Sequence, residues 1–170
     1  MTTLDYLIDS ALVLLVLVQI KERPLTTRGL LRPIFVLAIA VANCFHGFPT
    51  SGNDLVLLGV LALVGGVIGV LSGQTVLIRL ASDGQVLARA GWASAVYWIL
   101  GMGSRFGFIF WITHGGGSAI ARFSASHSIT GGQAWTAALL AMVAFEVLGR
   151  TAVLAIRWQR LQAPGTPEPA

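Results

Sequence analysis

The chain has 170 residues, of which 55% are hydrophobic and only 11% are charged, and its mean hydropathy is +0.79. Soluble domains carry about 25% charged residues, so this composition excludes an ordinary water-soluble globule. Several apolar runs approach or exceed the ~18 residues that cross the hydrocarbon core, which predicts an all-α, polytopic membrane protein. The net charge of +4 is scattered among loops, which indicates orientation signals and lipid contacts rather than a nucleic-acid surface.

The first third of the chain carries two predicted spans joined by a basic segment. The first covers about 6–20, follows Asp5 and is interrupted by Asp9. It lacks the basic n-region and the small-residue cleavage site of a signal peptide, so we expect a retained helix. The second span is predicted over about 33–48, with Pro33 in its first turn, where the missing N–H is not needed.

The middle of the chain predicts a third span and a small β-structure. The span covers about 55–71. Residues 75–90 then place Asp83 and Gly84 between two aliphatic runs, which is a strong hairpin signal. We expect a short hairpin that lies against the membrane surface or the helix ends. The alternative is an extension of the third helix that breaks at Gly84.

Two further spans are predicted in the last half, at about 92–113 and 134–158. The polar, Gly/Ser-rich stretch 114–133 between them is expected to be a loop. Residues 162–170 are too polar and Pro-rich to pack, which predicts a disordered tail. Because no internal repeat is present, residues 1–161 are expected to form a single five-helix bundle domain.

The basic residues predict the orientation of these helices. With the N-terminus outside, eight of the eleven Lys and Arg residues fall in inner segments, one falls in an outer segment and two lie within spans. The positive-inside rule therefore favours N-out, C-in, with the hairpin in the cytoplasm. The inner residues are Lys21, Arg23, Arg28, Arg32, Arg79, Arg89, Arg157 and Arg160, the outer one is Arg122, and those within spans are Arg105 and Arg150.

Charged residues inside the last two spans are the main candidate site. Glu146 and Arg150 are four residues apart and therefore share one helix face. At 1.5 Å per residue, Glu146 lies ~17 Å and Arg105 ~12 Å below the same outer surface, a difference that an arginine side chain can bridge. A lone charge at this depth costs several kcal/mol. We therefore expect a buried Arg105–Glu146–Arg150 cluster, with Asp9 as the available second carboxylate.

Such a cluster fits three kinds of function. Charges that only neutralise one another would fix the helix packing. An intramembrane carboxylate that faces a cavity would instead serve a small transporter or channel subunit, acting through Glu146 and Arg105. A membrane-embedded enzyme acting on a lipid or isoprenoid, with Glu146 or Asp9 as the acid, would need an apolar pocket that ends at the carboxylate.

Weaker signals lie at the span ends and among the glycines. Cys44, His46 and His114 offer thiolate and imidazole ligands, but their spacing matches no metal motif, so we predict no metal site. Small residues at GxxxG spacing predict faces of close helix packing, within the bundle or between protomers. These residues are Gly65, Gly69, Gly73, Gly103 and Gly107.

Four features together point to a known layout. A basic loop ends in Leu-Leu-Arg-Pro at 30–33, a strand-turn-strand pattern occupies 75–90, Arg105 lies inside the fourth span, and Arg150 lies late in the fifth. With these features the chain resembles the CcdC-like family of small bacterial integral membrane proteins over roughly residues 12–160. The resemblance implies a link, by name and gene neighbourhood, to cytochrome c biogenesis. It implies no catalytic residues, and Glu146 matches no position of the family.

We therefore predict a non-enzymatic accessory, assembly or sensing protein of the cell membrane. The resemblance implies a place near cytochrome biogenesis or respiratory machinery. The expected partners are the lipid bilayer and either another membrane protein or a second copy of the chain, and no nucleic acid. The sequence identifies neither a substrate nor a cofactor.

Overall fold

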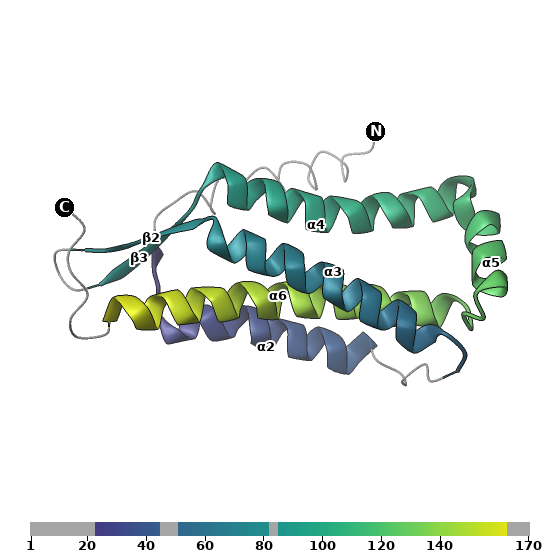
Figure 1. Ribbon diagram of the computed structural model, residues 1–170, viewed down its shortest axis with the longest axis horizontal. Helices are drawn as coiled ribbons and strands as arrows, with labels where there is room; N and C mark the ends of the chain where they lie inside the picture. The colour runs from purple at the N-terminus through teal and green to yellow at the C-terminus, as the bar shows by residue number, and fades with distance from the viewer. Residues whose placement is uncertain (1–22, 45–50, 82–84, 163–170) are drawn as a thin grey trace.

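The computed structural model describes residues 23–44, 51–81 and 85–162, which form an elongated helical bundle with a small sheet at one end (Figure 1). The predicted first span, 6–20, lies outside the described residues together with Asp9, and so do residues 163–170 of the predicted tail. We call the two ends of the bundle the sheet end and the α5 end.

Helices make up most of the described chain, and three short strands interrupt them. In chain order, the elements are β1 (Arg23–Pro24), α2 (Thr27–Cys44), α3 (Asp54–Gln74), β2 (Val76–Leu80), β3 (Val86–Ala90), α4 (Trp92–Trp111), a π-helical turn η1 (Ile112–Gly116), α5 (Gly117–Ser126) and α6 (Gly132–Gln162).

Three helical segments of the described chain are long and apolar enough to cross a membrane. They are α3, the stretch Trp92–Ser126, which holds α4 and α5 on either side of a kink at His114 and Gly115, and α6. Large apolar side chains point away from the bundle along them, as Leu63 (69% exposed) and Phe106 (64% exposed) do. Small residues such as Ala138 lie inside instead. An apolar exterior around a core of small residues is expected of helices packed in lipid, and it agrees with the predicted class.

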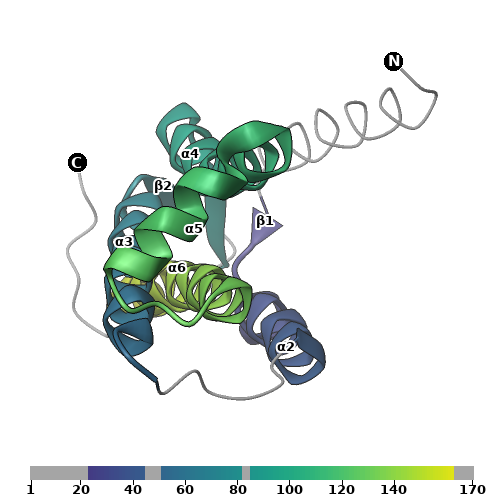
Figure 2. The ribbon, with the colours of Figure 1, turned by 90° about the vertical axis from the view of Figure 1, so that its right-hand side faces the viewer.

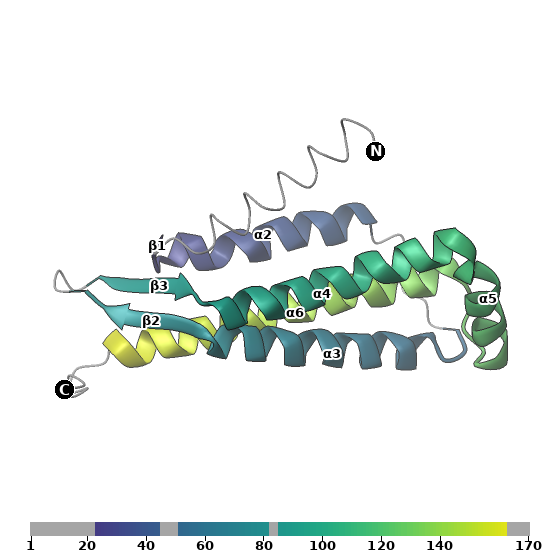
Figure 3. The same cartoon turned by 90° about the horizontal axis from the view of Figure 1, so that it is seen from above.

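Helices α2, α3 and α4 are arranged around α6. Seen from the α5 end, α3 lies on one side of α6 and α2 on the other, while α4 lies above α6 (Figure 2). The view from above shows the same order, with α4 over α6 and flanked by α2 and α3 (Figure 3). The short helix α5 crosses the end of the bundle and returns the chain from α4 to α6.

Glycines let α3 pack directly on the backbone of α6. A Cβ added to Gly65 would lie 2.0 Å from the carbonyl oxygen of Met142, and one added to Gly69 would lie 2.1 Å from that of Glu146. Gly73 continues this face one turn further. The predicted packing face of the third span is thus confirmed within the chain. Gly103 and Gly107 of α4 have open space around them, so the prediction of close packing there is not met by any described helix.

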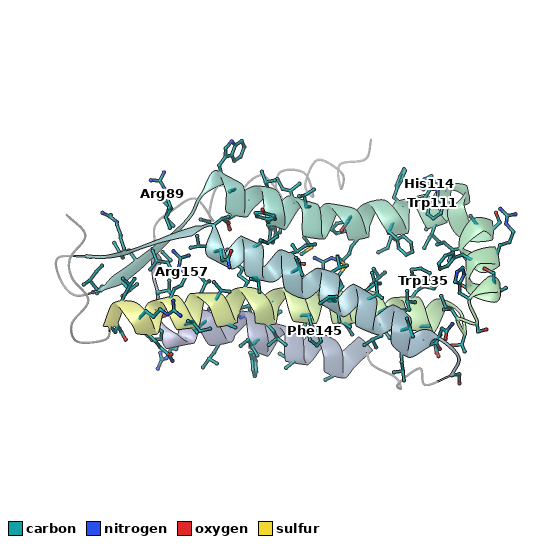
Figure 4. All side chains as sticks on the ribbon, viewed as in Figure 1. Arg89, Trp111, His114, Trp135, Phe145 and Arg157 are labelled. Carbon is teal, nitrogen blue, oxygen red and sulfur yellow. The ribbon has the colours of Figure 1, made fainter. Side chains whose placement is uncertain are left out.

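Polar contacts fasten both ends of α3. At the sheet end, Arg157 of α6 donates hydrogen bonds from Nη1 to the carbonyl oxygens of Gly73, Gln74 and Val76, at 3.1, 3.1 and 2.7 Å (Figure 4). A cation there complements the negative end of the α3 dipole. At the α5 end, the fully buried Asp54 accepts hydrogen bonds from the backbone N–H (2.9 Å) and from the hydroxyl of Thr130.

The predicted hairpin is present as β2 and β3. The two strands pair antiparallel, with Val76 opposite Ala90 and Leu80 opposite Val86. The alternative, a helix that continues to Gly84, is wrong. A third strand that was not predicted, β1, pairs with β3 and gives the order β1-β3-β2.

The second span begins six residues earlier than predicted. The predicted start at Pro33 is wrong because α2 begins at Thr27 and contains Pro33 in its interior. The side-chain oxygen of Thr26 accepts a hydrogen bond from the N–H of Gly29 at 3.2 Å, as N-terminal capping residues do. This cap starts the helix before the proline, and the helix then tolerates the hydrogen bond that Pro33 cannot donate.

The predicted loop 114–133 is also largely wrong, because η1 and α5 continue the helical chain to Ser126. The glycines and serines of this stretch favoured a loop. The residues of α5 that face the bundle nevertheless recur at helical spacing, an amphipathic pattern that predicts a short helix. They are Gly117, Ile120, Ala121, Ser124 and Ala125.

Candidate functional site

The centre of the bundle holds a buried ion pair. Nη2 of Arg105, on α4, lies 2.6 Å from Oε2 of Glu146, on α6, and the two side chains are 10% and 12% exposed. The predicted contact between these two residues is therefore present. It joins α4 to α6, which also meet at the rings of Phe108 and Trp135, with a centroid distance of 5.1 Å.

Two glycines position the Glu146 carboxylate. Gly69 of α3 lets the Glu146 backbone approach closely, because it carries no Cβ that would meet the carbonyl oxygen. Gly101 of α4 makes room for the carboxylate itself, because a Cβ added there would lie 2.5 Å from Oε1 of Glu146. Gly101 lies one turn before Arg105, so one face of α4 supplies both the space for the carboxylate and its counter-ion.

Glu146 satisfies only part of the Arg105 guanidinium. Nε and Nη1 of Arg105 are buried and have no hydrogen-bond partner among the described residues. A guanidinium carries five N–H donors and cannot lose its charge in a protein, so unpaired donors in the interior are costly. The described chain thus leaves this group with unused binding capacity.

A cavity of about 560 Å³ lies between this ion pair and the sheet end. Side chains of α2, the sheet, α4 and α6 line it. The charged residues of the described chain that line it are Arg32, Arg105, Arg150 and Glu146, three cations and one anion, and together they carry a formal charge of +2. We call it the charged cavity.

A second cavity, of about 800 Å³, lies between the ion pair and the α5 end. Side chains of α4, η1, α5 and α6 line it, and Arg105 is the charged residue among the described ones that do so. We call it the apolar cavity. Arg105 and Val143 line both cavities, so the two spaces meet at the ion pair.

The remaining predicted site residues are placed as follows. Arg150 lines the charged cavity beside Glu146, but it forms no ion pair with any described residue, so the described cluster is a pair with a neighbouring cation. Asp9 and His46 lie outside the described residues, and so does the side chain of Cys44. No three His, Cys, Asp or Glu residues within residues 23–44, 51–81 and 85–162 could hold a metal ion.

The ring of His114 is engaged locally at the α5 end (Figure 4). Its Nδ1 lies 2.9 Å from the carbonyl oxygen of Phe110, and the imidazole stacks on the Phe110 ring at a centroid distance of 4.0 Å. His127 repeats the arrangement one helix later against Phe123, at 2.9 Å and 4.1 Å. Each imidazole therefore binds back to a phenylalanine of the preceding helix, and neither lines the charged or the apolar cavity.

The sequence did not reveal Gly101, Val143 or the cavities. A signal existed for the first two, because Gly101 lies four residues before Arg105 and Val143 three residues before Glu146, each on the same helix face as its charged neighbour. The cavities depend on the distance between α4 and α6, which no local pattern encodes.

Comparison of the chain with protein-family models, with curated proteins and with solved structures finds no match. The resemblance to the CcdC-like family accordingly stays a prediction, and the site must be interpreted from its own chemistry.

Proposed function

We propose that the protein is a multi-pass protein of the cell membrane with five spans, oriented N-out and C-in. The distribution of charge along the bundle supports this orientation. The start of α2, the sheet and the end of α6 bring Arg28, Arg32, Arg79, Arg89, Arg157 and Arg160 to the sheet end, while Arg122 lies on α5. By the positive-inside rule the sheet end is cytoplasmic.

Within this membrane, the protein acts as a non-enzymatic accessory or sensing protein that binds a small anionic ligand at Arg105. The incompletely paired guanidinium carries this proposal. Two of its three nitrogens have no hydrogen-bond partner among the described residues, and it lines a cavity where arginines outnumber carboxylates. Intramembrane charges that face a cavity mark ligand or ion sites.

A purely structural ion pair would have a different environment. Buried ion pairs are maintained by hydrogen bonds that satisfy their remaining protons and lone pairs. In this bundle the pair adjoins a hollow on each side, and a third charge, Arg150, lies near Glu146 without forming a direct ion-pair contact with a described residue. An anion in the charged cavity would supply the missing acceptors and offset the excess of positive charge.

A transporter subunit is the second candidate, and one observation favours it. The two cavities approach the ion pair from opposite ends of the bundle and share Arg105 and Val143. Such a pair could separate two access routes, as gates near the membrane midplane do. The association with cytochrome biogenesis rests on the family resemblance alone and stays a prediction.

Copurification tests the binding function. The full chain is isolated from native membranes in mild detergent, and its bound anionic compounds are extracted and quantified by mass spectrometry. The double variant Arg105→Gln, Glu146→Gln removes the guanidinium and leaves two neutral side chains that can bond to each other. We expect near-stoichiometric anionic compound in the wild type and at least a tenfold loss in the double variant, because one charge-assisted hydrogen bond contributes about tenfold in affinity.

Arg122→Gln is the matched control, because Arg122 is exposed on α5 and lines neither cavity. It should retain the bound compound. Circular dichroism and size-exclusion profiles establish that each variant is folded. Equal amounts of anionic compound in the wild type and the double variant would refute binding at Arg105.

A further inference from the structure

The charged cavity has the chemistry of a phosphate site. Nε and Nη1 of Arg105 are unpaired donors of one charged group, and a phosphate offers several strong acceptor oxygens to such donors. Arg105 is itself only 9% exposed, so a ligand at these atoms is shielded from solvent. The formal charge of +2 from the described lining residues balances the charge of about −2 that a phosphate monoester carries at neutral pH.

The apolar cavity has the chemistry of a hydrocarbon site. Most of its lining is aliphatic or aromatic, and Arg105 is the one cation that the described residues contribute to it. Its volume falls within the ~300–1,000 Å³ of known ligand sites. The residues that give it this character include Ile109, Ile112, Ile120, Leu139, Leu140 and Trp135.

The charged cavity and the apolar cavity meet at Arg105 and extend from it toward opposite ends of the bundle. An amphiphile bound beside Arg105 can direct its polar group toward the sheet end and its apolar part toward the α5 end. At the sheet end, the exposed Arg32 of α2 also lines the charged cavity. Basic pockets between membrane helices bind anionic lipid head groups in this way.

We propose that the two cavities form one binding site for a lipid with a phosphate monoester head group. The phosphate contacts Arg105 and Arg150 in the charged cavity, and a hydrocarbon chain occupies the apolar cavity beside Leu140. This inference rests on the proposed binding function and specifies its ligand. A free phosphate would use the same arginines but would leave the apolar cavity unused.

Binding of two defined probes tests the proposal. The full chain is placed in phosphatidylcholine nanodiscs, and its thermal stabilisation is measured with dodecyl phosphate and with inorganic phosphate. Partition into the bilayer raises the apparent affinity of dodecyl phosphate for every variant equally, so the comparison among variants decides. Leu140→Trp fills the apolar cavity, and Leu148→Trp is the control on an exposed position of the same helix outside both cavities.

We expect Leu140→Trp to weaken dodecyl phosphate binding about tenfold, because a larger side chain competes with the hydrocarbon for the same space. Its binding of inorganic phosphate should be unchanged, which also shows that the variant is folded. Leu148→Trp should leave both affinities unchanged. Arg150→Gln should weaken both probes about tenfold by removing a charged donor.

Two results would overturn the proposal, and they can be told apart. Equal binding of dodecyl phosphate by Leu140→Trp and Leu148→Trp would show that the hydrocarbon chain of the lipid lies outside the apolar cavity. The proposed function would still stand if both variants bound inorganic phosphate at the arginines. Failure of the wild type to bind either probe would refute phosphate recognition altogether. If Leu140→Trp does not fold, Ile120→Trp fills the same cavity from α5 and takes its place.

Discussion

Glu146 is held from two sides at once. Its backbone lies against Gly69 of α3, and its carboxylate lies against Gly101 and Arg105 of α4. Three helices therefore converge on one residue that could not stay charged in lipid by itself. The strength of the pair can be measured separately from any ligand.

A double-mutant cycle on Arg105 and Glu146 measures that strength. Arg105→Gln or Glu146→Gln alone should lower the free energy of unfolding by about 3–5 kcal/mol, because each leaves a buried charge without its partner. The double variant should lose less than the sum, with a coupling energy of about 1–3 kcal/mol. Reversible unfolding by SDS in mixed micelles provides the measurement. Strictly additive losses would mean that the two side chains do not interact in the folded protein.

The contact between Arg105 and Glu146 could be predicted because depth along a helix follows from residue number alone. The state of Arg150 could not be predicted in this way. Spacing places it on the same face as Glu146, but its side chain had several directions open to it. The unpaired nitrogens of Arg105 were likewise hidden, because a sequence shows which groups can meet and not how many hydrogen bonds they complete.

At the scale of elements, the contact between α3 and α6 depends on glycines, which have no side chain to keep the two backbones apart. Gly65, Gly69 and Gly73 recur every four residues, and this face of α3 touches the backbone of α6. The glycine spacing predicted that face. The start of α2 was mispredicted because Pro33 suggested a helix start, whereas the cap at Thr26 begins the helix earlier. The helix α5 was mispredicted because the glycines and serines of its stretch favoured a loop.

Gly69→Ala tests this close approach. The added methyl group would overlap the carbonyl oxygen of Glu146, so α3 and α6 must separate, and we expect a loss of about 1–3 kcal/mol in the free energy of unfolding. Gly59→Ala is the matched control on the same helix, because an added Cβ there meets nothing within 4 Å. It should be neutral or slightly stabilising in SDS titrations, as alanine favours a helix over glycine. A similar loss in both variants would contradict the close packing of α3 on α6.

At the scale of the whole molecule, the two ends of the bundle differ in charge and in architecture. The sheet and most of the described arginines lie at one end, and α5 with Arg122 lies at the other (Figure 1). The number of apolar runs and the asymmetry of charge were both present in the sequence. The hollow between α4 and α6 was not, because it arises from how the helices are spaced and not from any one of them.

The proposed orientation predicts which end reacts with an impermeant reagent. In a Cys44→Ser background, Ser118→Cys on α5 should be labelled by a membrane-impermeant maleimide added to intact cells. Arg89→Cys in β3 should be labelled only after the membrane is opened, because the basic end stays in the cytoplasm. Both positions are exposed, so a difference reports sidedness rather than burial. The reverse pattern would invert the proposed topology.

The fastening of α3 at both ends has a mechanical consequence. Asp54 anchors it to the turn that begins α6, and Arg157 anchors it to the far part of the same helix, so α3 and α6 are held together at both ends. Among the described residues, α4 is connected to this pair of helices near its middle by the Arg105–Glu146 bond. An anion that binds only Nε and Nη1 of Arg105 leaves this bond from Nη2 intact, so the site can fill without separating α4 from α6.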